Sequence, residues 1–129
     1  MEINFLKKRA EEFLKTSEYH FREGMYELTT FDLEQSLQLF LKYTIYLKNR
    51  NYPPTHSLKS LFKILGETYN VEKNLEEITK DKIHLISNLE QAYISSRYLP
   101  FYYTKEEVLE MRDFVNKIIK FLEDLWEKI

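Results

Sequence analysis

Apolar residues at helical spacing recur in five segments of the chain, and this pattern constrains the fold more than any other feature. Side chains three and four positions apart lie on one face of a helix, so each segment presents an apolar stripe that other helices must cover. The segments fall at about residues 3–23, 30–49, 58–66 and 75–95, with the last one following Thr104. None shows the sustained alternation of a half-buried strand. The sequence therefore predicts an all-α bundle of about five helices.

Helix-breaking residues are few and mark the ends of these segments. Two glycines and three prolines in 129 residues are too few for the many turns of a β-rich fold. Gly24 is a natural stop for the first helix. The candidate caps are Thr29 or Thr30 for the second helix, Thr55 or Ser57 for the third and Thr104 for the last. Because the connections are short, we expect neighbouring helices to run antiparallel in an up-and-down bundle.

Chain length and composition limit the functional classes. The length of 129 residues fits a single domain over residues 1–129. The lack of cysteine excludes disulfides, thiolate metal sites and a cysteine nucleophile, and with no apolar leader it leads us to expect a cytoplasmic protein. No apolar run approaches the ~18 residues of a membrane span, so no membrane association is expected. The formal charge of −2 gives no whole-molecule attraction to nucleic acid, although a local basic patch stays open.

The second and fifth segments carry more apolar surface than a one-sided helix requires. A central helix surrounded by neighbours has this pattern. A helix–helix interface between two copies of the chain has it too, because aromatic residues are favoured there. Both interpretations can hold at once, and we expect a homodimer. The candidate interface residues are Leu39, Tyr43, Tyr46, Phe121 and Trp126.

Two polar clusters are candidates for contact with a ligand or partner. Thr55, His56 and Ser57 follow a proline turn at the expected start of the third helix, where they either cap the helix or contact an anion such as phosphate.

The second cluster lies where the fourth helix ends and combines Arg97 with Tyr93, Tyr98 and Tyr102. An arginine beside tyrosines suits a phosphate, a stacked base or a protein interface. The structural alternative is that the aromatic rings pack the end of the bundle while Arg97 pairs with a carboxylate or a helix carbonyl.

No catalytic or metal-binding set is complete in the sequence. The three histidines, His20, His56 and His84, lie in different segments and lack the i, i+4 spacing of a helical zinc site. Acidic pairs such as Glu76 and Glu77 are adjacent, and adjacent side chains diverge around a helix. Glycine-rich phosphate-binding motifs are missing. We therefore expect no metal and no cofactor, and we name no catalytic residue.

The order of these landmarks resembles the HEPN family, small helical proteins of archaea and bacteria. The resemblance covers nearly the whole chain and rests on four features: the break at Gly24, QSLQLFLK at residues 35–42, PPTHSLKSL at 53–61 and AYISSRYLP at 92–100. The Thr-His-Ser-Leu and Arg-Tyr-x-Pro-like segments are its most specific parts. The resemblance implies a helical bundle, commonly dimeric. It also implies a minimal nucleotidyltransferase partner, often encoded beside it in a toxin–antitoxin-like pair.

Many HEPN proteins resemble ribonucleases whose motif is an arginine followed four to six residues later by a histidine. Two such motifs meet in a dimer, where they would assist 2′-hydroxyl attack on RNA and stabilise phosphate charge. Here no histidine follows Arg97, and the corresponding residues are Phe101, Tyr102 and Tyr103. Arg50 and His56 have the spacing but straddle the proline turn, which we interpret as coincidence.

The resulting hypothesis is a non-catalytic or degenerate HEPN protein that dimerises and binds a nucleotidyltransferase partner. His56, Arg97 and the nearby tyrosines are expected to contact that partner, a nucleotide or RNA. One alternative is an active ribonuclease toxin, a metal-independent endoribonuclease. Another is a helical protein-interaction module without a ligand.

Overall fold

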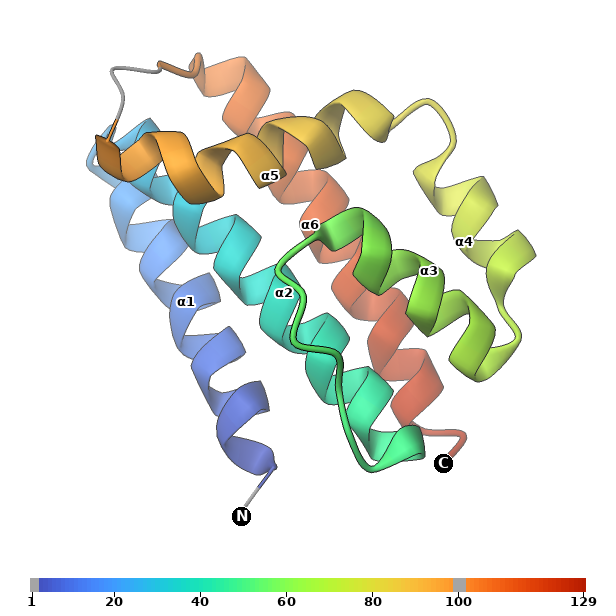
Figure 1. Ribbon diagram of the computed structural model, residues 1–129. Coiled ribbons are helices and arrows are strands. Elements are labelled where there is room, and N and C mark those ends of the chain that lie inside the picture. Colours follow the sequence, from blue (N-terminus) through green and yellow to red (C-terminus); the bar gives the residue numbers. More distant parts are fainter. Residues whose placement is uncertain (1–2, 99–101) are drawn as a thin grey trace.

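A computed structural model of the chain describes residues 3–98 and 102–129, with the side chains of residues 95–97 outside that description. Within these ranges the chain is helical and contains no strand, which confirms the predicted all-α class. The helices are α1 (Asn4–Arg22), α2 (Tyr26–Asn49), α3 (Leu58–Tyr69), α4 (Glu72–Thr79), α5 (Ile83–Tyr98) and α6 (Lys105–Trp126) (Figure 1).

The fourth predicted segment is two helices rather than one, because the chain breaks between α4 and α5. Asp81 lies in this break with φ 61°, in the left-handed region that ends a right-handed helix. Aspartate visits this region more readily than most residues because its short side chain hydrogen-bonds locally. Ile78 and Leu85 are seven positions apart, which is close to two helical turns, so the apolar spacing continues across the break and conceals it.

The caps predicted for the third and last helices are partly confirmed. Ser57 caps α3 by accepting a hydrogen bond from the Ser60 amide at 3.2 Å. Thr104 and Glu107 form a capping box at the start of α6, each side chain bonding the other residue's amide. Gly24 follows the end of α1 and has φ +74°, as expected of a stop.

Two other boundaries predicted from the sequence are wrong. The second helix starts at Tyr26, so Thr29 and Thr30 lie inside it, and their hydroxyls donate to backbone carbonyls one turn earlier. The third helix continues through Gly66 to Tyr69. Gly66 lies inside the helix and faces α4, where a Cβ added to it would lie 3.3 Å from a side-chain carbon of Glu72.

Helix α2 lies at the centre of the bundle and packs against α1, α3, α5 and α6 (Figure 1). Its apolar side chains Leu33, Leu37, Leu41 and Ile45 are completely buried. The extra apolar surface of this segment is therefore covered within the chain, which supports the central-helix interpretation.

The expected dimer-interface residues take part in this packing. The Tyr43 ring meets the Trp126 ring edge-on at 5.2 Å, and Trp126 Nε1 donates to Thr44 Oγ1 at 2.8 Å. Leu39 and Phe121 are half-buried against the core. Tyr46 is half-buried and its ring lies 6.3 Å from that of Tyr52. These contacts leave self-association as a prediction.

The connection between α2 and α3 positions the candidate site. Arg50 ends α2 in the left-handed region, at φ 63°. The loop that follows runs back along α2, so that α3 starts beside the middle of α2 rather than at its end (Figure 1). His56 thereby reaches Gln38, 18 residues earlier in the sequence.

Candidate functional site

The structure brings together two residues that the sequence placed in separate clusters. His56 precedes α3 and Tyr93 lies on α5, and their rings stack with centroids 5.4 Å apart and planes 21° from parallel. His56 is exposed and Tyr93 is half-buried, so the imidazole is the more accessible ring of the pair.

A chain of hydrogen bonds leads from this stack into the centre of the bundle. His56 Nδ1 lies 2.9 Å from Gln38 Oε1, and Gln38 Nε2 donates to Glu34 Oε2 at 2.8 Å. The other Glu34 oxygen accepts from Gln35 Nε2 at 2.7 Å. Glu34 and Gln38 are one helical turn apart on α2, so their side chains meet on one face.

Glu34 is a carboxyl group in a nearly water-free position, with a side chain that is 0% exposed. Burial raises the pKa of Glu34 from 4.5 to about 7, and repulsion from Glu90 adds to the rise. The two glutamine amides and Lys42 act in the opposite direction. Burial also lowers the pKa of Lys42, because the charged ammonium is desolvated there, while Glu34 opposes the change.

The start of α3 already has its hydrogen-bonding groups engaged. Thr55 Oγ1 accepts from the Ser57 amide at 3.1 Å, and Glu90 Oε2 accepts from the Leu58 amide at 3.0 Å. With Ser57 capping the helix, Thr55 and Ser57 serve the turn itself. The Glu90 carboxylate lies at the N-terminus of α3, where a bound anion would otherwise lie. Its hydrogen bond to the Leu58 amide links α5 to α3.

The arginine–tyrosine cluster is divided by the fold. Tyr93 joins His56, whereas Tyr98 and Tyr102 are 73% and 77% exposed. Tyr103 is buried and its hydroxyl donates to the Asn88 carbonyl. Arg97 belongs to the last turn of α5, and its side chain lies outside the described residues.

Sequence reasoning missed three polar residues of this site: Gln38, which contacts His56, Glu34, which holds Gln38, and Glu90, which accepts from the Leu58 amide. Glu34, Gln38 and Glu90 are ordinary surface residues by type, and only Gln38 fell within a quoted motif. The available signal was a polar pair at i, i+4 within a helix otherwise apolar on most sides, because buried polar groups need partners. Which partner each one meets depends on the loop that returns along α2, and helical spacing does not determine that path.

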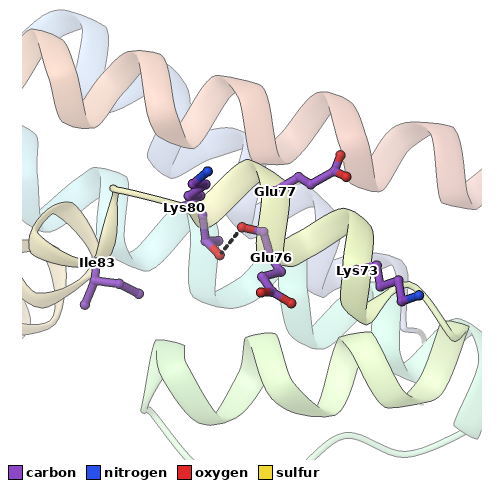
Figure 2. A pocket seen from close by; sticks show the side chains of 6 residues that line it. Lys73, Glu76, Glu77, Lys80 and Ile83 are labelled. Carbon is purple, nitrogen blue, oxygen red and sulfur yellow. Dashed lines mark hydrogen bonds between the residues drawn. The ribbon is translucent and has the colours of Figure 1, made fainter.

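Among the described residues, the other polar groups lie apart from this network. His20 Nδ1 pairs with the buried Asp32 at 2.5 Å, away from the two other histidines in sequence. A hollow of about 630 Å³ beside α4 is lined by lysines and glutamates whose side chains point apart (Figure 2). Among the side chains that the structure describes, no group of three histidines or carboxylates could hold a metal ion. None of the described helices is long and apolar enough to cross a membrane.

Comparison with known proteins identifies one family and one fold neighbour. A family model described as the HEPN domain matches residues 3–125. The crystal structure of TT1696 from Thermus thermophilus has a TM-score of 0.75 and 24% sequence identity, over 95% of this chain and 97% of that one. At this identity the likeness concerns the fold. A search of curated proteins gave no match.

Proposed function

This chain belongs to the HEPN family, and from that premise we propose that it is a non-catalytic member that acts in the cytoplasm as a homodimer. It binds a nucleotidyltransferase partner in a toxin–antitoxin-like pair and holds a nucleotide against the His56–Tyr93 stack.

The observation that carries the nucleotide part is the exposed stack on a buried polar support. Aromatic faces bind nucleobases in a way that tolerates different bases, and a ring already held in place loses little freedom on binding. Here the His56 ring is fixed on one side by Tyr93 and at one nitrogen by Gln38. The residues after Arg97 supply no histidine, which favours binding over cleavage.

The partner part is supported by the family and by the surface aromatics. Tyr98 and Tyr102 are strongly exposed at the α5–α6 end of the bundle. Tyrosine is enriched in protein interfaces because it combines apolar area with a polar hydroxyl.

Calorimetric titration of the purified protein with AMP tests nucleotide binding. His56→Ala is expected to weaken binding roughly 5- to 150-fold, the range of one lost base–aromatic stack. His84→Ala is the matched control, because His84 is an exposed histidine on α5 outside the stack. No binding of AMP, or equal affinity of the two variants, would overturn this part.

Co-expression with a minimal nucleotidyltransferase from the same organism, followed by pull-down, tests the partner. Tyr98→Ala combined with Tyr102→Ala is expected to reduce capture, whereas Tyr19→Ala, which removes an exposed tyrosine of α1, is expected to leave it unchanged. Lack of capture by the unaltered protein refutes the partner part. Capture without AMP binding would leave the third function, an interaction module without a ligand.

A ribonuclease is the second candidate, and one observation favours it. Gln38 holds His56 through Nδ1, so Nε2 is the nitrogen available for proton transfer. This function predicts RNA cleavage in the presence of a chelator, lost in His56→Ala and kept in His84→Ala. RNA that stays intact during long incubation rules it out.

A further inference from the structure

We propose that Glu34 and Gln38 are positioning residues that keep the proton of neutral His56 on Nδ1, so that Nε2 faces the ligand as a hydrogen-bond acceptor. The statement about His56 stands on the hydrogen bonds of the free protein. Its consequence for the ligand rests on the proposed nucleotide site.

The first step is the orientation of the Gln38 amide. An ionised carboxylate only accepts hydrogen bonds. The atom that faces Glu34 Oε2 at 2.8 Å must therefore be the amide nitrogen of Gln38, Nε2. The second Glu34 oxygen, Oε1, accepts a hydrogen bond from the amide nitrogen of Gln35 at 2.7 Å. Both amides therefore turn their nitrogen toward Glu34, and the Gln38 carbonyl oxygen is turned away from it.

The second step transfers this orientation to His56. The Gln38 carbonyl oxygen lies 2.9 Å from His56 Nδ1, and two acceptors cannot form a hydrogen bond. Nδ1 must therefore carry a hydrogen and donate it to Gln38. In a neutral imidazole the other nitrogen then has a lone pair and no hydrogen. Histidine free in water favours the opposite tautomer, so the network reverses the usual preference.

The third step is what Nε2 presents to a ligand. Stacking on Tyr93 holds the imidazole plane, and the bond at Nδ1 fixes which edge of the ring points away from the bundle. No hydrogen bond to Nε2 is found among the described side chains. The lone pair therefore suits a donor on the ligand, either a ribose hydroxyl or the amine of a nucleobase.

The charged groups around Glu34 define when the network operates. Lys42 on α2 favours the ionised carboxylate, and Glu90 on α5 opposes it. His56 faces Glu34 only through the Gln38 amide. Because burial raises the pKa of Glu34 to about 7, measurements at pH 8.5 address the ionised network.

Nuclear magnetic resonance of the imidazole ¹⁵N and ¹³Cδ2 nuclei at pH 8.5 tests the proposal without any ligand. In the unaltered protein, His56 is expected as the Nδ1–H tautomer, whereas His84 serves as an internal control with the solution-like Nε2–H tautomer. His84 is suitable because its ring is exposed and its Nε2 lies 3.9 Å from Glu110, too far for a hydrogen bond. Finding the Nε2–H tautomer at His56 overturns the proposal.

Two variants assign the effect to the named residues. Gln38→Met removes the amide with little change of shape, and His56 is expected to revert to Nε2–H. Glu34→Gln leaves the Gln38 amide free to face either way, so His56 is expected as a mixture of tautomers. A helical circular dichroism spectrum equal to that of the unaltered protein shows that each variant is folded. A folded variant of either kind that keeps the pure Nδ1–H form contradicts the positioning role, and the unaltered protein remains decisive if one variant fails to fold.

The ligand part is tested by calorimetry with three nucleotides at pH 8.5. AMP is compared with 2′,3′-dideoxyAMP, which lacks both sugar hydroxyls, and with purine riboside monophosphate, which lacks the base amine. Loss of the donor to Nε2 is expected to weaken binding roughly 2- to 10-fold. Weakening by one analogue identifies the source of the donor, and equal binding of all three overturns the ligand part. Absence of AMP binding would refute the nucleotide site while leaving the tautomer measurement intact.

Discussion

Replacing Glu34 with glutamine is expected to stabilise the protein at alkaline pH and to make its stability less dependent on pH. Burial raises the pKa of this carboxyl from 4.5 to about 7 in the folded chain. A folded pKa above the unfolded value means that the native state binds the proton more tightly. The corresponding stability is fully present below pH 4.5 and is lost as pH rises toward 7.

The size of this effect follows from the two pKa values. They differ by about 2.5 pH units, and each unit corresponds to about 1.36 kcal/mol, so ionisation of Glu34 removes about 3 kcal/mol. Glutamine has nearly the same shape and never ionises. Glu34→Gln should therefore gain about 3 kcal/mol relative to the unaltered protein between pH 4.5 and pH 8.

Urea unfolding followed by circular dichroism at several pH values between 4 and 8.5 measures this difference. Glu76→Gln is the control, because Glu76 is exposed on α4 and lies outside the Glu34 network. The difference between Glu34→Gln and the unaltered protein also cancels contributions from other groups, such as Asp32. A difference that stays constant across the pH range would refute the reasoning.

Three further substitutions test separate parts of the packing. Trp126→Phe removes the hydrogen bond to Thr44 and should cost about 1 kcal/mol of unfolding free energy, measured by circular dichroism in urea. His20→Ala leaves the buried Asp32 carboxyl without its partner and should cost about 3 kcal/mol near pH 6, where adding Asp32→Asn should recover part of the loss. Gly66→Ala should raise the melting temperature by a gain of up to ~1 kcal/mol in helix propensity, since the nearest atom, 3.3 Å away, belongs to a flexible exposed side chain of α4. A lower melting temperature would show that the α4 side chain cannot move aside for the added methyl group.

Helical periodicity predicted the fold class because each helix buries one stripe, and that requirement is local. It failed where a single backbone angle decides the structure, as at Asp81, whose left-handed conformation separates α4 from α5 without disturbing the apolar spacing. The cap at Thr104 was predicted from its residue type and its place before the last apolar stripe, whereas the reciprocal bond from Glu107 is known only from the structure. At Thr29 and Thr30 the same chemistry was misread, because a hydroxyl bonds equally well to a carbonyl inside a helix.

The candidate site was predictable only in its exposed half. His56 and Tyr93 were named as candidates from their residue types and their neighbours in the sequence. Their stacking depends on how α5 packs across α2. Glu34 and Gln38 carry no surface signal, since they become important through burial. A pair of polar residues one turn apart on a central helix is the pattern that would have drawn attention to them.

The central position of α2 has a consequence for how the protein opens. Because α2 is shared by α1, α3, α5 and α6, its amides are expected to exchange hydrogen with water only through global unfolding. Helix α4, which packs mainly on α3, should exchange first. Glu34 and Gln38 belong to the slow class, so the support beneath His56 should last as long as the folded state itself, while the surface around α4 opens and closes.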